Sequence, residues 1–494
     1  MTRNAAVELL ATNLAGDRAS RISYFDRDGG HSYQSLADRS RQFAHLLTET
    51  GITPGDRLLL ALEDTVAFPI CFLGALQAGV VAVPLNTLLT AADYAFITED
   101  SGAGAIVASS SLVDRIPAGL LQFGVNVNAQ GWHDLHASLS DQPVSPVEPL
   151  SGGDDIAFWL YTSGTTGQPK GVMHSHNNML ATAELYGRAI LDLNEDDIVY
   201  SAAKLFFAYG LGNALTFPLS VGASVVLLDT LPKPESVNAL LTEQRPTVFF
   251  GVPTLYARLL NSGNIPHDHC LRLCVSAGEA LPEAILQRWR EQTGVQILDG
   301  IGSTEMLHIY ISNRPGDIRP GTSGRPVAGY QVKILDDAGK AVADGDMGDL
   351  YVAGPSRTAG YWNRPELNRA TFDGVWMRTG DKYVHNSSGA YAYCGRSDDL
   401  LKVGGIYVSP MEVENTLLEH PAVAECAVVG RADDDGLIKP KAFVVANTED
   451  ISGQDLIDHV ATRLAPYKRP HWVAFVEQLP KTATGKIQRF KLRE

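Results

Sequence analysis

Apolar, β-rich runs alternate with helical stretches twice along the first part of the chain. Up to about residue 150, runs such as DRLLLAL and AGAIVAS alternate with helical stretches such as YQSLADRSRQFAHLLTET. The same rhythm returns between Ile156 and Asp299, where SVVLLD, PTVFFGV and LRLCVSAG are strand candidates with helices between them. Because parallel strands need crossover connections, this alternation predicts an α/β fold with two parallel-type layered subdomains.

The pattern changes between Gly321 and Arg396. Turn residues crowd in (GTSGRPVAGY, DDAGKAVADGDMGD) between short alternating strands such as YQVKIL and DLYVAG. This is typical of antiparallel structure and predicts a small β-barrel subdomain. After GRSDDLLKVGGIYVSP, which we interpret as a hinge, about a hundred residues have their own helix and strand pattern. We therefore expect a large N-terminal domain over residues 1–397 and a small, mobile C-terminal α/β domain over residues 398–494.

The charge of the chain is unevenly distributed. The 494 residues include 40 basic and 56 acidic side chains, a net charge of −16, and 45% are hydrophobic, which excludes the disordered classes. An acidic chain is a poor partner for nucleic acid. Residues 462–494 carry eight basic and two acidic side chains, a net +6. A basic tail of this kind is either a solvated surface or a surface that meets a polyanionic small molecule.

Few features indicate export or membrane insertion. The five cysteines are too scattered for a disulfide framework, and the N-terminus lacks the pattern of a signal peptide. The most apolar stretch, FPICFLGALQAGVVAVPL (Phe68–Leu85), contains Gln77, glycines and prolines. We interpret it as a buried helix followed by a strand. The chain is expected to be cytoplasmic, with no membrane partner.

The segment YTSGTTGQPKG (Tyr161–Gly171) follows the strand candidate IAFWLY. Its glycines allow the backbone to approach an anion, its hydroxyls add donors, and Lys170 supplies a charge that can reach a β- or γ-phosphate. The spacing is not that of a Walker A loop. Composition alone leaves a Ser/Thr/Gly-rich surface loop as an alternative. His174 and His176 are expected at the start of the following helix, as cap-region or substrate-rim residues.

YTSGTTGQPKG resembles the phosphate loop of the acyl-adenylate-forming superfamily, which includes acyl-CoA synthetases, adenylation domains and firefly-type luciferases. GIGSTE (Gly300–Glu305), RTGD (Arg378–Asp381), GRSDDLLKVGG and PKTATGKIQR (Pro480–Arg489) resemble its other signatures and follow in the expected order. The resemblance covers essentially the whole chain. It implies that ATP, Mg²⁺ and coenzyme A are used to convert a carboxylic acid into an acyl-AMP and then a thioester.

The resemblance also implies which residues bind the nucleotide and coenzyme A. The phosphate-loop positions are Thr162, Ser163, Gly164, Thr165, Thr166 and Gly167. The adenine and phosphate positions are Ala277, Gly278, Glu279, Asp299, Gly300, Ile301, Ser303 and Thr304, the ribose positions are Asp381 and Arg396, and the pantetheine positions are Gly404 and Gly405. Ile301 departs from the family, which often has an aromatic residue there, so adenine stacking at this position stays open.

The catalytic residues implied by the resemblance are Lys486, Glu305, Thr304 and Lys170. Adenylation brings an anionic carboxylate against an anionic α-phosphate, so a positive charge such as that of Lys486 is needed between them. Glu305 corresponds to the family's Mg²⁺ ligand. Asp398 corresponds to the hinge about which the C-terminal domain rotates between the two half-reactions.

The acyl-pocket region looks most like that of benzoate-CoA ligases and their aryl-CoA relatives. Small residues around an aromatic ring in AAKLFFAYGLGN favour a flat, short slot that suits a benzene ring. The implied pocket residues are Phe207, Ala208, Tyr209, Gly210, Gly302, His308, Ile309 and Lys402. Ordinary core packing remains the alternative for FFAYG and His308.

The predicted function is therefore ATP-dependent activation of benzoate or a substituted benzoate, with transfer to coenzyme A. Three alternatives stay open: a stand-alone enzyme that loads an acyl carrier protein, a non-catalytic nucleotide-binding scaffold, and, on composition alone, a kinase or ATPase. The first would have a separate carrier protein as its partner. A homodimer is the assembly to test.

Overall fold

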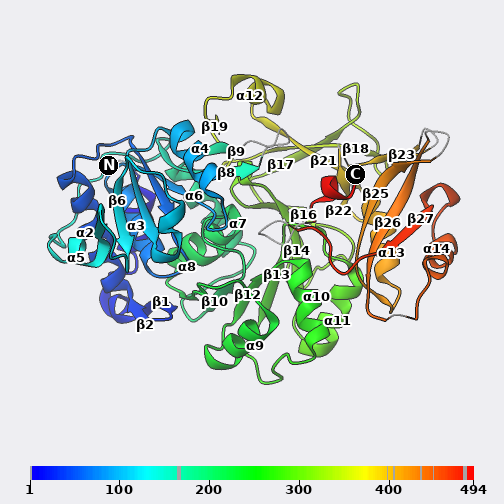
Figure 1. Cartoon of the computed structure of the whole chain (residues 1–494), viewed down its shortest axis with the longest axis horizontal. Helices are drawn as coiled ribbons and strands as arrows, with labels where there is room; N and C mark the ends of the chain where they lie inside the picture. The colour runs from blue at the N-terminus through cyan, green and yellow to red at the C-terminus, as the bar shows by residue number, and fades with distance from the viewer. Residues whose placement is uncertain are drawn as a thin grey trace.

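The computed structural model describes residues 3–163, 169–397, 399–403, 406–433, 437–448, 450–481 and 487–493. For Ser163 and Lys402 it describes only the backbone. Gly164, Thr165, Thr166, Gly167, Asp398, Gly404, Gly405 and Lys486 lie outside the described residues. The fold-class prediction is confirmed: the chain forms two large mixed sheets, a separate antiparallel sheet and a C-terminal α/β unit (Figure 1).

The first large sheet has eight strands in the order β19-β9-β8-β4-β3-β5-β6-β7, and its centre is parallel. The strands are β3 (Arg57–Ala61), β4 (Val81–Pro84), β5 (Ala105–Ser109), β6 (Leu121–Val125), β7 (Trp132–Asp134), β8 (Ile156–Ser163), β9 (Pro169–Ser175) and β19 (Gly360–Tyr361). β8 and β9 form an antiparallel pair around the candidate phosphate loop. β19 joins the edge of β9 from far along the chain, which brings residue 361 beside residue 172.

The second large sheet has nine strands in the order β16-β15-β14-β13-β12-β10-β11-β1-β2. The strands are β1 (Ile22–Asp26), β2 (Gly29–Ser32), β10 (Ile198–Ser201), β11 (Ser224–Val226), β12 (Val248–Gly251), β13 (Leu273–Ser276), β14 (Ile297–Gly302), β15 (Ile309–Ser312) and β16 (Arg325–Pro326). The five strands β11, β10, β12, β13 and β14 are neighbours in this order and run parallel to one another. Ligands of parallel sheets bind outside the carboxyl ends of the strands, so this edge is the place to look for a site.

Helices fill the space between the two large sheets and cover their outer faces. One apolar core joins α1 (Ala5–Ala11), α2 (Tyr33–Glu49) and α3 (Ala67–Gln77) to residues of both sheets. On the outer faces, α4 (Ala91–Ser101) covers the first sheet, and α9 (Pro234–Glu243), α10 (Pro253–Ser262) and α11 (Glu283–Thr293) cover the second. The remaining helices of this part are α5 (Leu135–Ser140), α6 (His176–Thr182), α7 (Ala208–Leu211) and α8 (Phe217–Val221).

The most apolar stretch of the sequence is confirmed as a buried helix and strand, α3 and β4. Every residue of both elements is buried, because α3 lies between the two large sheets. Within the described ranges, no helix is long and apolar enough to cross a bilayer.

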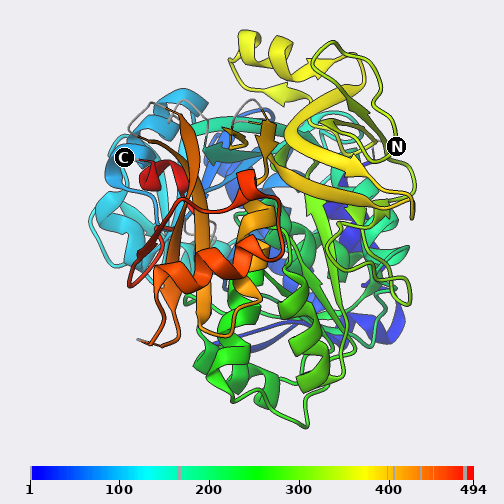
Figure 2. The same ribbon diagram turned by 90° about the vertical axis from the view of Figure 1, so that its right-hand side faces the viewer.

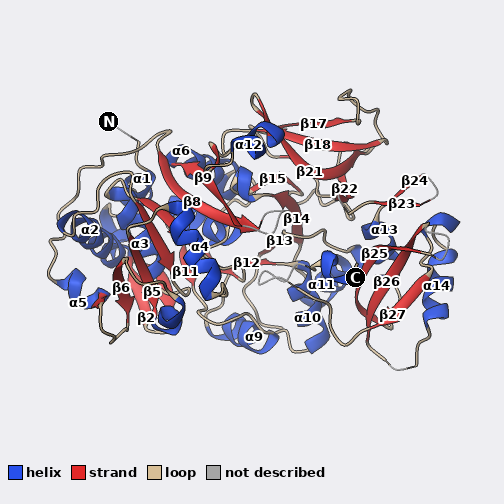
Figure 3. Ribbon diagram, turned by 45° about the horizontal axis from the view of Figure 1, so that its top comes forward, coloured by secondary structure: helices blue, strands red, loops and turns tan. Residues whose placement is uncertain are grey.

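The turn-rich region forms a five-stranded antiparallel sheet, in which β17, β18 and β21 lie side by side with α12 near one end (Figure 3). Its elements are β17 (Gln331–Leu335), β18 (Met347–Ala353), α12 (Pro365–Thr371), β20 (Phe372–Asp373), β21 (Trp376–His385) and β22 (Tyr391–Arg396). One core connects this sheet to β14 and β15, so the three parts of the N-terminal region pack as one body.

The C-terminal unit has its own small core. It contains β23 (Leu401–Val403), β24 (Ile406–Val408), α13 (Pro410–Leu418), β25 (Val423–Ala432), β26 (Ile438–Ala446), α14 (Gly453–Ala461) and β27 (Trp472–Phe475). Figure 2 shows this orange and red unit in front of the rest of the chain. The separate core agrees with a small C-terminal domain; the boundary at residue 398 and its mobility stay predictions.

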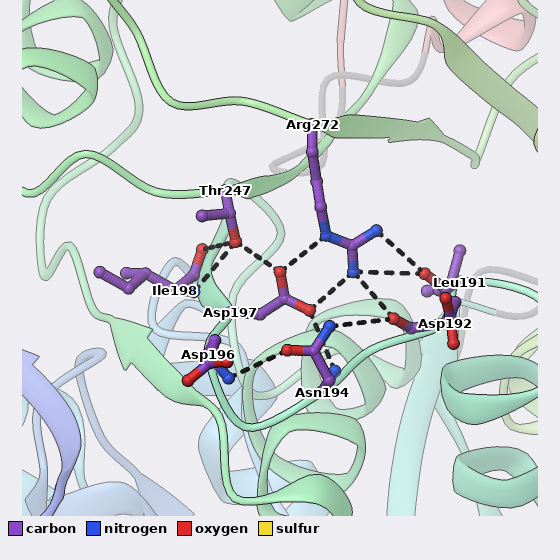
Figure 4. A network of polar contacts seen from close by, with 8 residues as sticks. All are labelled: Leu191, Asp192, Asn194, Asp196, Asp197, Ile198, Thr247 and Arg272. Carbon is purple, nitrogen blue, oxygen red and sulfur yellow. Dashed lines mark hydrogen bonds and ion pairs between the residues drawn. The ribbon is translucent and has the colours of Figure 1, made fainter.

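A polar network fastens the amino ends of three neighbouring strands (Figure 4). Asp197 is the residue directly before β10, Thr247 the one before β12, and Arg272 the one before β13. The Arg272 guanidinium donates to both Asp197 carboxylate oxygens, at 2.8 and 2.6 Å, and the Thr247 hydroxyl donates to one of them at 2.7 Å. Arg272 also donates to the carbonyl oxygens of Leu191 and Asp192. The network is therefore at the amino ends of these strands, away from the carboxyl ends where a ligand site is expected.

We expect Asp197→Asn to destabilise the protein by about 2 kcal/mol, because it leaves Arg272 without its buried anionic partner. Burial raises the pKa of Asp197, but hydrogen bonds from Arg272 and Thr247 lower it more, so the pKa lies below its ordinary value. The stabilisation is thus present above the unfolded-state pKa, about 4, and is lost as the pH falls through the lower folded-state pKa. Thermal unfolding at pH 7 and pH 3 measures both effects, and the difference between wild type and variant should shrink at pH 3.

The matched control is Asp196→Asn, which makes the same change on a neighbouring side chain that is 88% exposed. Equal unfolding temperatures for the two variants at pH 7 would contradict the assigned contribution of the network.

Candidate active site

A cavity of about 810 Å³ lies where the two large sheets, the antiparallel sheet and the C-terminal unit meet. It opens at the carboxyl ends of β13 and β14, where ligands of parallel sheets bind. Its wall includes many of the predicted site residues: Thr162, Lys170, Gly278, Glu279, Asp299, Gly300, Ile301, Gly302, Ser303, Thr304, Glu305, Asp381 and Arg396. The structure therefore brings together residues that are more than two hundred positions apart in the sequence.

Glu305 lies in a short turn of 3₁₀ helix (Thr304–Met306) directly after β14. Its Oε1 accepts a hydrogen bond from the Tyr361 hydroxyl at 2.8 Å and lies 3.4 Å from the Lys170 Nζ. That Nζ also stands 3.9 Å from the centre of the Tyr361 ring. Burial raises the pKa of Glu305, but Lys170 and Tyr361 outweigh it and bring the pKa below its ordinary value. Glu305 is therefore an anion at neutral pH, on the wall of the cavity.

Asp381 and Arg396 face each other across the β21–β22 ladder. The Arg396 Nη1 donates to the Asp381 Oδ1 and to the Thr379 carbonyl oxygen, both at 3.2 Å. Gly380, which lies between Thr379 and Asp381 in the sequence, has a φ of +78°, and an added Cβ there would lie 2.8 Å from the Arg396 Nη2. The left-handed backbone at this turn therefore favours glycine. The corner presents a carboxylate and a guanidinium to the cavity.

Most of the predicted adenine positions lie along one side of the cavity, at residues 278–279 and at the end of β14 (residues 299–302), which we call the nucleotide shelf. Gly302 has no room for a side chain, since an added Cβ would lie 2.6 Å from the carbonyl oxygen of His308, the residue before β15. Ile301 presents an apolar, partly buried side chain to the cavity. Burial raises the pKa of Asp299 well above its ordinary value, and its Oδ1 lacks a hydrogen-bond partner among the described residues. Ala277 is buried at 4% exposure and does not belong to the wall.

The predicted aryl-pocket residues pack against one another behind this wall. The Tyr209 ring lies 5.4 Å from the His308 ring, and the His308 Nε2 lies 3.0 Å from the Asn213 Oδ1. Burial lowers the pKa of His308 to about 3, so the ring is neutral. The following predicted pocket residues do not line the large cavity: Phe207, Ala208, Tyr209, Gly210, His308 and Ile309. Their role in binding the acid stays a prediction.

Gly210 is small for a reason that the sequence did not reveal. An added Cβ would lie 2.0 Å from the carbonyl oxygen of Lys204, so only glycine lets α7 pack on the preceding loop. The packing of the backbone, and not only the shape of a substrate slot, therefore explains this residue.

The C-terminal unit contributes Glu414, Ile487 and Arg489 to the cavity wall. The Ile487 backbone N–H donates to the Glu279 Oε1 at 3.2 Å, which links the two parts of the chain. Arg489 donates to both carboxylate oxygens of Glu414, at 3.0 and 2.7 Å. The segment that follows residue 486 is thus held against the candidate nucleotide shelf.

Two residues near the site were missed or misplaced by the sequence analysis. Tyr361 stands in the turn-rich GPSRTAGYWNRP segment, and no pattern indicated that it would pair with β9 and reach Glu305. His174 was expected in a helix but lies in β9, and α6 begins at His176. The strand continues because β9 pairs with β8 as far as residue 175.

Comparison with known protein families agrees with this site. The family model described as "AMP-binding enzyme" matches residues 11–362, and the model described as "AMP-binding enzyme C-terminal domain" matches residues 412–486. The chain belongs to the AMP-binding enzyme family. The predicted membership of the acyl-adenylate-forming superfamily is thereby confirmed.

Similar members of the AMP-binding enzyme family are named for aromatic acids. The chain is 50% identical to a benzoate–CoA ligase of Thauera aromatica, over 99% of this chain and 95% of the relative. It is 44% identical to a 4-hydroxybenzoate–CoA/benzoate–CoA ligase of Rhodopseudomonas palustris, over 99% and 94%. A crystal structure of a benzoate CoA ligase from Burkholderia xenovorans LB400 matches with a TM-score of 0.94 at 49% identity, covering 99% of this chain and all of the other.

Proposed function

We propose that the protein converts benzoate, or a benzoate with a small ring substituent, into its coenzyme A thioester. The protein is an AMP-forming acid–thiol ligase that makes an aryl-AMP from ATP and then an aryl-CoA. The observation that carries the choice of benzoate is the 50% identity to a benzoate–CoA ligase over nearly the whole chain. Relatives named for hydroxybenzoate and anthranilate keep substituted benzoates within the proposal.

The residues on the cavity wall fit the first half-reaction. A carboxylate oxygen of the acid attacks the α-phosphorus of ATP, and pyrophosphate leaves. We assign Asp381 and Arg396 to the ribose, and Lys170 to the phosphates that leave, because all three line the cavity and stand in the motifs that resemble the family's. Glu305, which is anionic and faces the cavity, would hold Mg²⁺, and the bound ion would neutralise phosphate charge.

The second half-reaction forms the thioester. The thiol sulfur of coenzyme A attacks the carbonyl carbon of the aryl-AMP, AMP leaves, and the thiol proton passes to solvent. The proposal assigns Lys486 to adenylation and Asp398 to the rotation that then clears the path for the thiol. Gly404 and Gly405 are assigned to the pantetheine tunnel. These assignments rest on the motifs that contain the four residues.

Transfer to a carrier protein is the alternative acceptor reaction, and relatives named as CoA ligases do not favour it. We place the reaction in the cytoplasm, where ATP and coenzyme A are both available. The proposal of a homodimer is tested by light scattering of the purified protein.

A panel of acids tests the choice of substrate. ATP–pyrophosphate exchange would be measured with benzoate, 2-aminobenzoate, 4-hydroxybenzoate, acetate and butyrate, and thioester products would be identified by mass after adding coenzyme A. We expect exchange with benzoate to be the fastest. Exchange with the alkyl acids alone would overturn the aryl proposal.

Tyr361→Phe is expected to lower the rate of pyrophosphate exchange by about 10- to 100-fold. The change removes a hydrogen bond to a charged carboxylate, worth about 1.5–3 kcal/mol, and leaves the ring that contacts Lys170. Tyr33→Phe is the matched control, because it removes a buried hydroxyl that bonds a backbone oxygen far from the cavity. Similar exchange rates in the two variants would show that the Tyr361 hydroxyl does not support Glu305.

A further inference from the structure

His174 lies wholly buried in β9, with its ring stacked on Phe158 at 5.4 Å. Its Nε2 lies 2.7 Å from the carbonyl oxygen of Thr304, and its Nδ1 lies 3.2 Å from the Asn178 Oδ1. A carbonyl oxygen can only accept a hydrogen bond, so the hydrogen of the short contact belongs to Nε2. Burial lowers the pKa of His174 to about 4, which makes the neutral ring the form present at pH 7.

The orientation of Asn178 shows which of its atoms faces the other ring nitrogen. Its Oδ1 accepts from the Ser175 backbone N–H at 3.1 Å, and its Nδ2 donates to the Pro355 carbonyl oxygen at 3.0 Å. A flipped amide would lose both bonds, so Asn178 presents an acceptor to the His174 Nδ1. Both ring nitrogens thus face acceptors, and we assign the one hydrogen of the neutral ring to Nε2, because its 2.7 Å contact with the Thr304 carbonyl oxygen is the shorter of the two.

The Thr304 carbonyl belongs to the peptide unit that carries the backbone N–H of Glu305. In a planar trans peptide the C=O and the N–H point in opposite directions. That N–H contributes to lowering the pKa of the Glu305 carboxylate itself. When His174 holds the carbonyl on one side, it therefore also aims the N–H on the other side.

The peptide unit after Glu305 is bonded by Thr358, which in turn bonds the same strand, β9. The Thr358 backbone N–H donates to the Glu305 carbonyl oxygen at 2.7 Å, and the Thr358 hydroxyl donates to the Met173 carbonyl oxygen at 2.6 Å. Two successive residues of β9, Met173 and His174, thus set the backbone on either side of Glu305. The two peptide units leave the residue little freedom to turn.

We propose that His174 is a positioning residue for the adenylation half-reaction: its Nε2–H orients the Thr304–Glu305 peptide and through it the Glu305 carboxylate. The inference rests on the proposed function of Glu305 in using Mg²⁺ with ATP. His174 does not line the cavity and reaches the site only through the carbonyl oxygen of Thr304. Its effect should therefore appear in the use of the metal and in the adenylation rate, and not in the affinity for the acid.

The test compares His174→Leu with His174→Gln in the full chain. Leucine removes the donor, whereas the glutamine amide can donate to the Thr304 carbonyl oxygen from a similar reach. Because groups that orient a metal ligand typically contribute 10–100-fold, we expect His174→Leu to weaken Mg²⁺-dependent ATP binding, measured by titration calorimetry, by about 10-fold or more. It should lower kcat for pyrophosphate exchange to a similar extent and leave KM for benzoate within about 2-fold; glutamine should restore both losses.

His176→Gln is the matched control, because His176 is a neighbouring buried histidine that contacts the backbone of Ala5 and the Ser151 hydroxyl instead of the turn. Wild-type Mg²⁺ dependence in His174→Leu, or an equal loss in His174→Gln, would overturn the inference. If the leucine variant does not fold, His174→Asn replaces it, since the shorter amide cannot reach Thr304 and should fail where glutamine succeeds. The calorimetric readout needs no turnover, so a wild-type protein that binds Mg²⁺ and ATP but activates no aryl acid would refute the proposed function alone.

Discussion

Glu305→Gln is expected to lower the rate of acyl-AMP formation by about 10²–10³-fold, the usual cost of removing one group that stabilises developing charge. Glutamine keeps the size of the side chain and can still accept the Tyr361 hydroxyl hydrogen. It removes the negative charge that faces Lys170 at 3.4 Å and that suits a hard divalent cation. Pyrophosphate exchange at increasing Mg²⁺ concentration measures the change, and the variant should need more Mg²⁺ than wild type.

Glu412→Gln makes the same substitution on the C-terminal unit, where the side chain is 41% exposed and pairs with Lys468. We expect this control to keep nearly all of the exchange activity. A Glu305→Gln protein that exchanges pyrophosphate at the rate of the control would contradict the assignment of Glu305 to the metal.

Lys486→Ala is expected to reduce acyl-AMP formation by about 10²–10³-fold or more, because adenylation then brings two anions together without a cation between them. The residue lies outside the described part of the chain, but its neighbour Ile487 lines the cavity and bonds Glu279. The second half-reaction should be spared, since Lys486 is assigned only to the first. Single-turnover assays that start from benzoate and ATP, or from supplied benzoyl-AMP and coenzyme A, separate the two.

Lys491→Ala removes an equal charge from the same tail, at an exposed position. It should form acyl-AMP at close to the wild-type rate. Equal loss in both half-reactions of Lys486→Ala would mean that the lysine supports the fold or the nucleotide, and not the first chemical step.

Much of the fold could be predicted because it depends on local patterns. The alternation of strands and helices indicated the two layered sheets, and the turn-rich segment indicated the antiparallel sheet. The stretch Phe68–Leu85 was placed correctly as a helix and a strand, since charge-poor segments interrupted by glycine and proline pack inside proteins more readily than they span a bilayer.

The positions of many residues on the cavity wall could also be predicted, because they belong to motifs that resemble the signatures of the family. The contacts that hold these residues could not. Tyr361 reaches Glu305 only because β19 pairs with β9, and His174 reaches Thr304 only because β9 lies beside the turn after β14. Such contacts between distant segments leave no periodic signal in one sequence. Most residues of the predicted aryl pocket pack on one another behind the cavity wall, so the structure does not connect them to the cavity.

Product analysis with benzoate, ATP, Mg²⁺ and coenzyme A tests the central claim most directly. The purified protein would be incubated with all four, and the nucleotide and acyl products would be quantified by chromatography and mass spectrometry. The account predicts one benzoyl-CoA, one AMP and one pyrophosphate per benzoate consumed. Formation of ADP, or of benzoyl-AMP that accumulates without any thioester, would contradict it.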